Sequence, residues 1–86
     1  MKVYFTKDFI KKSNKLIKRN SQLEKRLTKQ ITLFKKNTQH PSLKLHKLKG
    51  QRSNQFAIWI EGNLRALCIQ DNDEYVFFDF ITHDEY

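Results

Sequence analysis

The sequence predicts an α+β fold: an N-terminal strand, an antiparallel helical hairpin, and then an antiparallel β-meander of about four strands. Two patterns lead to this prediction. Apolar side chains recur at helical spacing through the first half of the chain, and short apolar runs separated by turn signals follow from residue 42 onward. Because the chain has only 86 residues, we expect 1–86 to form a single domain.

The first half begins with a short strand, Lys2–Phe5, and continues into two amphipathic helices. Thr6 is an N-cap candidate for a first helix that ends near Asn20. The next four residues, Ser21–Glu24 (SQLE), have the pattern of a capping box at the start of a second helix. The apolar face of that helix repeats at i, i+4, i+8 and i+11, with Leu23, Leu27, Ile31 and Phe34.

The second half is predicted to be the meander. Pro41 stops the preceding helix, because proline disfavours helical geometry in the residue before it. Gly62 and Asn63 suit a two-residue hairpin turn between two apolar runs. The expected strands are Ser42–Gly50, Phe56–Glu61, Leu64–Gln70 and Tyr75–Ile81.

A strand register can also be predicted. If Glu61 pairs with Leu64, Gln70 pairs with Tyr75 and simple alternation holds, one sheet face carries eight apolar positions and one arginine. We expect this face to pack on the helices. The apolar positions are Phe56, Ile58, Ile60, Leu67, Ile69, Val76, Phe78 and Phe80. The arginine is Arg65, and a charge among apolar side chains is costly unless an anion meets it.

Charge and cysteine content narrow the class of protein. Seventeen Lys and Arg against nine Asp and Glu give a net charge of +8, which favours a polyanionic partner such as nucleic acid or an acidic protein. The lone thiol, Cys68, excludes an internal disulfide. No run is apolar enough to span a bilayer and the first residues do not resemble a signal peptide, so we expect a cytoplasmic location.

The C-terminal sequence FFDFITHDEY is the strongest candidate for an active site. Its His83 lies beside Asp84, Glu85 and Tyr86, where neighbouring carboxylates can tune a general acid or base. The alternative is a solvated tail. A base and Arg65 near the same end of the sheet favour phosphoryl chemistry on RNA.

A second candidate region is the lysine-rich strand before Gly50. Its cations, with nearby Arg52, are expected to form a phosphate-binding patch of Lys44, Lys47, Lys49 and Arg52. The alternative interpretation is an ordinary solvated edge strand. His46 is a candidate second proton-transfer group. His46 and His83 lack supporting metal ligands at suitable spacing, so neither a metal nor another cofactor is expected.

Other side chains have competing interpretations. Trp59, Phe77 and Leu64 are expected on the sheet face away from the helices, where they would stack on bases, receive a partner, or be covered by another segment. Cys68 lies mid-strand with no histidine placed to activate it, which argues against a nucleophile.

Three segments in this order, HPSLKLHKLKG, NLRALCI and DFITHDEY, resemble the RelE/ParE superfamily of bacterial toxins. The resemblance covers essentially the whole chain, including the βααβββ order, and is greatest to RelE-type members. It implies a ribosome-dependent endoribonuclease that cuts mRNA without a metal and is held inactive by a small acidic antitoxin, which would also mediate any contact with operator DNA.

The resemblance also implies roles for individual residues. Arg65 would stabilise the scissile phosphate, His83 would act as acid or base, and His46 and Tyr86 would correspond to further site residues. Ile81 stands where the family pattern has glycine. Two alternatives remain open: a ParE-like poison of DNA gyrase, and a catalytically inactive partner-binding module of the same fold.

Overall fold

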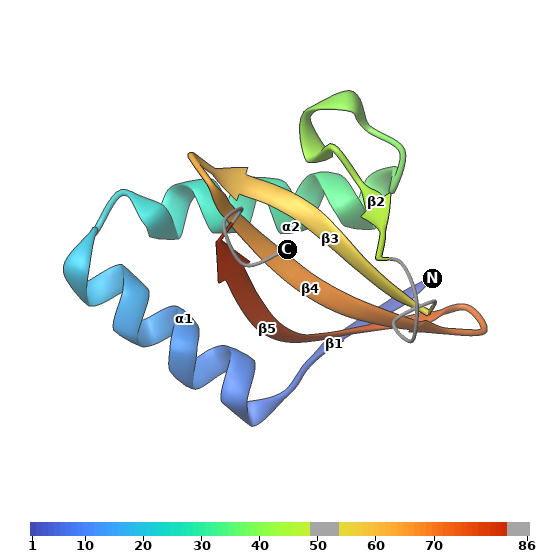
Figure 1. The fold of residues 1–86 in the computed structure, drawn as a ribbon, viewed down its shortest axis with the longest axis horizontal. Coiled ribbons are helices and arrows are strands. Elements are labelled where there is room, and N and C mark those ends of the chain that lie inside the picture. Colours follow the sequence, from blue (N-terminus) through green and yellow to red (C-terminus); the bar gives the residue numbers. More distant parts are fainter. Residues whose placement is uncertain (49–53, 83–86) are drawn as a thin grey trace.

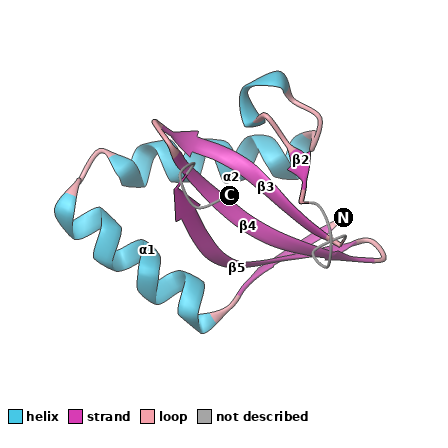
Figure 2. Cartoon of the chain, in the orientation of Figure 1, coloured by secondary structure: helices cyan, strands magenta, loops and turns pink. Residues whose placement is uncertain are grey.

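The computed structural model describes residues 1–48 and 54–82, and it confirms the predicted α+β order (Figure 2). The elements are β1 (Lys2–Phe5), α1 (Lys7–Arg19), α2 (Leu23–Lys36), the 3₁₀ turn η1 (Pro41–Leu43), β2 (His46–Lys47), β3 (Gln55–Glu61), β4 (Leu64–Asp71) and β5 (Glu74–Thr82). Neither helix of the described ranges is long and apolar enough to cross a membrane.

The strands form one five-stranded sheet in the order β1-β5-β4-β3-β2. The last four strands form the predicted antiparallel meander, whereas β1 pairs in parallel with β5 and makes the sheet mixed. Both helices pack on the same face of this sheet, with α2 running behind β3 and β4 in Figure 1. We call the other sheet face, which bears Ala57, Leu67 and Ile81, the distal face.

The two helices begin differently. Thr6 caps α1 as predicted, since its Oγ1 accepts a hydrogen bond of 3.1 Å from the Phe9 N–H. The predicted capping box is wrong: the N-cap of α2 is Gln22, whose side chain makes no capping bond. The Gln22 N–H instead donates to Asn20 Oδ1 at 3.2 Å, so a turn centred on Asn20 joins the helices.

An aromatic cluster holds the helices on the sheet. The Phe9 ring lies 5.7 Å from that of Phe77 and 4.5 Å from that of Phe80, and Phe34 meets Phe77 edge-on at 5.3 Å. Phe34 and Phe77 are completely buried. Phe77 and Leu64 therefore belong to the helix-side core, which corrects their predicted place on the opposite face.

The predicted strand Ser42–Gly50 is much shorter in the structure. Residues Pro41–Leu43 form a 3₁₀ turn, and Lys44 follows in the left-handed region with φ of 48°. This turn redirects the chain, and β2, as far as the structure describes this segment, comprises His46–Lys47, which pairs with β3. Gly50 lies outside the described residues.

Both predicted turn-flanking pairs are present: Glu61 pairs with Leu64, and Gln70 pairs with Tyr75. A β-bulge between Trp59 and Glu61 then shifts the pairing, so that Trp59, not Ile60, lies opposite Arg65. Ala66 and Cys68 face the helices in place of Leu67, and Leu67 joins the cluster on the distal face.

A second irregularity, between Leu67 and Cys68, shifts the pairing of β4 with β5. Phe77 and Phe80 thereby both reach the helix side, while Phe78 packs on the distal side. The first shift, between Trp59 and Glu61, places Arg65 on the distal face, opposite the face predicted for it.

Candidate functional site

The distal face combines a small apolar floor with polar side chains at one end. The floor consists of Leu48, Ala57, Leu67 and Ile81, with Phe78 packed against it. Three side chains of functional interest share this face by strand register: Arg65 and Trp59, which pair across β3 and β4, and His46, which pairs with Ala57. This face is the candidate functional site.

Arg65 is half-buried between Trp59 and Ile81, its two cross-strand partners. One of its terminal nitrogens donates to the carbonyls of Gly62 and Leu64, each at 3.4 Å. Within residues 1–48 and 54–82 no carboxylate forms an ion pair with it. A guanidinium has five N–H donors, so this arrangement leaves donors for an external anion.

Trp59 stabilises the tip of the β3–β4 hairpin through a hydrogen bond beside Arg65. Its indole N–H donates to the Gly62 carbonyl at 2.8 Å, and that same carbonyl accepts from Arg65. Gly62 takes a φ of 53°, a conformation that suits glycine in a tight turn. Two cations lie over the indole ring, Lys44 at 4.9 Å and Arg26 at 5.6 Å from its centroid.

His46 is exposed in β2 and shares the distal face with Arg65, but two strand spacings separate them. Strand geometry places their backbones on the order of 10 Å apart. The two side chains can therefore flank a bound substrate from opposite sides.

The predicted basic patch is divided. Lys44 lies over Trp59, whereas Lys47 pairs with Phe56, whose side chain packs toward the helices. Lys49 and Arg52 fall outside the described ranges.

The two C-terminal candidates, His83 and Tyr86, also lie outside the described residues. The last described residue, Thr82, pairs with Leu64, which precedes Arg65 in β4. The described part of β5 therefore ends close to Arg65. Ile81, which stands where the RelE-type pattern has glycine, does not have the positive φ that favours glycine. Its side chain is buried on the distal face. In the described ranges only Lys44 and Asn72 have a positive φ among non-glycine residues.

Two ionisable side chains on the helix side are kept neutral. Burial raises the pKa of the Cys68 thiol to about 12, so it stays protonated at neutral pH and is a poor nucleophile. Burial also raises the pKa of Tyr75. The part of the chain that the structure describes contains no cluster of three His, Cys, Asp or Glu side chains suited to a metal.

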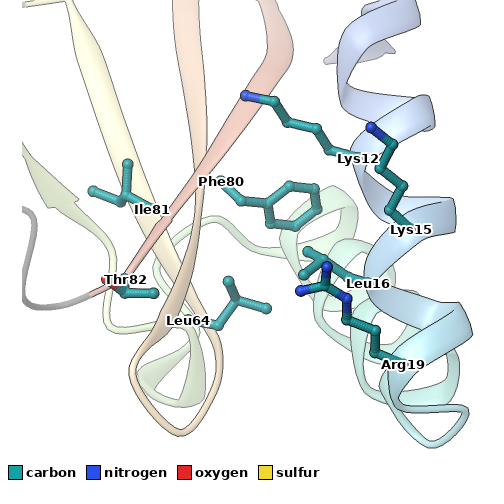
Figure 3. Close-up of a pocket in the computed structure, with 8 residues that line it drawn as sticks. All are labelled: Lys12, Lys15, Leu16, Arg19, Leu64, Phe80, Ile81 and Thr82. Atoms are coloured by element: carbon teal, nitrogen blue, oxygen red, sulfur yellow. The ribbon is translucent and has the colours of Figure 1, made fainter.

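A pocket of about 280 Å³, which was not predicted from the sequence, lies between α1 and the end of β5 (Figure 3). Lys12, Lys15 and Arg19 line its helical side, and Leu16, Leu64, Phe80, Ile81 and Thr82 complete it. The three cations are spaced i, i+3 and i+7, which places them on one helix face. That spacing was the available signal, and Phe80 was predicted on the helix side, but only the bulged register shows that Leu64 also lies beneath these cations.

Several solved structures of toxins share this architecture. No protein-family model matches the chain, and no curated protein matches it. Among solved structures, the YoeB/ParE toxin from Agrobacterium tumefaciens aligns with a TM-score of 0.78 at 14% identity, over 96% of this chain and 99% of that one.

The particular neighbours include YafQ from E. coli strain BL21(DE3). It aligns with a TM-score of 0.75 at 18% identity, over 96% of this chain and 93% of that one. YafQ in the E. coli DinJ–YafQ complex also aligns with a TM-score of 0.75, at 19% identity and with the same coverage. The predicted RelE-like fold is thus confirmed: this chain has the fold of the YoeB/ParE and YafQ toxins.

Proposed function

We propose that this protein is the toxin of a type II toxin–antitoxin system and acts as a ribosome-dependent endoribonuclease on mRNA. The observation that carries the proposal is the position of Arg65. It presents a half-buried guanidinium, without a carboxylate partner in the described residues, on the sheet face where the strand leading to His83 ends. The shared fold with known toxins and the net charge of +8 support the same function.

The proposed reaction is attack of a ribose 2′-hydroxyl on the adjacent phosphate. A general base removes the 2′-hydroxyl proton, the 2′-oxygen forms a bond to phosphorus, and the bond from phosphorus to the 5′-oxygen breaks. A general acid gives the leaving oxygen a proton. The products are a 2′,3′-cyclic phosphate and a 5′-hydroxyl, and this proton transfer requires no metal.

Each candidate residue has a role in this scheme. His83 is the proposed acid or base, and Arg65 stabilises the charge that develops on the phosphate. His46, on the far side of the distal face, supplies the second proton-transfer group, with Tyr86 as a further site residue. Lys44, Lys47, Lys49 and Arg52 contact the RNA backbone.

The proposed partner in the inactive state is an acidic antitoxin segment. The E. coli DinJ–YafQ complex shows that a protein of this fold assembles with a second protein. The pocket between α1 and β5 suits an acidic amphipathic segment, because cations line its helical side and Leu16 and Phe80 form an apolar floor. Dissociation of the complex should accelerate with salt, and a salt-independent rate would contradict this electrostatic contribution.

The function is tested by adding the full chain to a purified translation system and mapping mRNA 5′ ends by primer extension. We expect new ends within the decoding register and cyclic phosphates at the upstream fragments, with no cutting of the same RNA without ribosomes. A parallel assay of DNA supercoiling by gyrase distinguishes the ParE-like gyrase poison from the proposed ribonuclease. Supercoiling lost with mRNA intact would establish that alternative, and no effect in either assay would indicate an inactive binding module.

A further inference from the structure

We propose that Trp59, Arg26 and Lys44 form a second phosphate-binding site, which holds the single-stranded RNA beside the scissile phosphate. We call these three residues the Trp59 site. The inference deepens the proposed ribonuclease function, because it extends the RNA path from Arg65 over the edge of β3 onto α2. The sequence alone predicts an RNA contact for Lys44 and, as one of several interpretations, base stacking for Trp59, but no role for Arg26.

The first argument is the clustering of like charges. The Arg26 guanidinium and the Lys44 ammonium both lie within 6 Å of the same indole centroid, at 5.6 and 4.9 Å. In residues 1–48 and 54–82, neither forms an ion pair with a carboxylate. The ring's electron-rich surface attracts each cation, but the two cations repel one another. A bound phosphate would relieve that repulsion.

The second argument is a polar pocket that adjoins Arg26. It has a volume of about 480 Å³ and is lined by Gln22, Lys25, Arg26, Lys29 and Glu61. Three cations thus outnumber the one carboxylate. That carboxylate is engaged elsewhere, because Glu61 Oε2 accepts a hydrogen bond of 3.1 Å from Asn20 Nδ2. The pocket retains a net positive charge with which to receive an anion.

The third argument is continuity with the proposed scissile phosphate. Trp59 and Arg65 are direct cross-strand partners, and the Gly62 carbonyl accepts a hydrogen bond from both side chains. An RNA strand bound at Arg65 therefore meets Trp59 at the next strand, and then the cations of α2. The shared carbonyl also ties the position of the indole to that of the guanidinium.

The chemistry of this surface favours RNA over an acidic peptide. Every side chain that lines the α2 pocket is polar or charged, so it offers no apolar floor for the anchor residues of an amphipathic segment. Such a floor exists in the separate pocket between α1 and β5. Cations grouped on an aromatic ring and a wet basic groove are the features that bind phosphodiester backbones.

The test uses Trp59 itself, since it is the single tryptophan of the chain. Intrinsic fluorescence of the full-length protein is titrated with a short single-stranded RNA at several salt concentrations. We expect a saturating change in Trp59 emission. For single strands, each phosphate contact contributes about 0.7 to the salt slope, so Arg26→Gln with Lys44→Gln should lower that slope by about 1.4.

The matched control is Lys11→Gln with Lys36→Gln, which removes the same charge at exposed positions of α1 and α2 away from the Trp59 site. The control pair should leave the slope within error of the parent, and thermal unfolding verifies that both variants fold. Equal slopes for the two double variants would overturn the proposal. So would a fluorescence response to polyglutamate but not to RNA.

The failure of this site and the failure of the ribonuclease function are distinguishable. If the parent cuts mRNA but the double variant at Arg26 and Lys44 binds RNA like the control, the Trp59 site is wrong and the function stands. If the parent binds RNA with the expected slope but leaves mRNA intact during translation, the site stands and the ribonuclease function is wrong.

Discussion

The two faces of the sheet differ in the burial and the polarity of their side chains. The helix side contains a dense aromatic cluster in which Phe34 and Phe77 are fully buried. Phe34 meets Phe77 edge-on, and the Phe77 ring is tilted against that of Phe9. The distal face has a smaller apolar floor and carries exposed or half-buried polar side chains, including Arg65 and His46. Stability therefore depends mainly on the helix side, which allows the distal face to present groups suited to binding and catalysis.

The largest expected effect comes from the proposed acid–base residue. His83→Ala should slow mRNA cleavage by about 10²- to 10⁴-fold, as expected for loss of a general acid or base, with little change in unfolding temperature. Its control is His40→Asn, because His40 caps η1 by accepting from the Ser42 N–H at 3.2 Å, a role that asparagine can also fill. Equal cleavage rates for both variants would assign the C-terminal segment no catalytic role.

A substitution in the helix-side core is expected to change stability, whereas the substitution of His83 is expected to change catalysis. Phe77→Ala should lower the free energy of unfolding by about 3–5 kcal/mol, because it leaves a cavity among Phe5, Phe9 and Phe34. Urea unfolding measures this change. Tyr4→Ala, at a position with 46% exposure, is the control and should cost far less. Similar losses for the two variants would contradict the division between the faces.

A smaller effect concerns the buried thiol. Below pH 9.0 both states keep the Cys68 proton, but above it only the folded state does, since its pKa is about 12. Stability must therefore fall as pH rises. Between about pH 8 and about pH 10 the parent should lose about 1.4 kcal/mol more than Cys68→Ala. If the unfolding free energies of the two proteins changed with pH in parallel, the thiol would not be desolvated in the folded state. The two proteins should cleave mRNA at the same rate.

The smallest expected effect tests the hairpin tip. Trp59→Phe keeps an aromatic ring but removes the indole donor to Gly62, which should cost about 0.5–1.5 kcal/mol of stability. Because Arg65 uses the same carbonyl, cleavage should also decrease more than RNA affinity does. A loss of affinity alone, with the rate on bound mRNA unchanged, would separate Trp59 from the positioning of Arg65.

The helices and the order of elements could be predicted because their signals are local. Apolar spacing marked both helices, and Gly62-Asn63 marked the hairpin. The faces of the strands could not be predicted in the same way. Segments such as FAIWIE and YVFFDFI are apolar on both faces, so alternation does not select a register. The bulge between Trp59 and Glu61 reverses the face of Arg65 and, because Phe77 pairs with Cys68, that of Phe77 as well.

The residues of the candidate site could be predicted from their type, but their arrangement could not, because it depends on the strand register. Residue type alone singled out Arg65 and His46, but their common place on the distal face depends on the bulged register. Arg26 gave no signal of its own, since it is one of several cations on α2. Its position over Trp59 depends on how α2 packs against β3, which only tertiary structure determines.

The most direct test of the account compares two arginines in ribosome-bound mRNA cleavage under single-turnover conditions. Arg65→Ala removes the guanidinium of the distal face, and Arg19→Ala removes one from the pocket beside α1. The account predicts a loss of about 10²- to 10³-fold for Arg65→Ala, as for removal of a transition-state donor, and an unchanged rate for Arg19→Ala. Full cleavage by Arg65→Ala, or equal losses in both variants, would contradict the assignment of catalysis to the distal face.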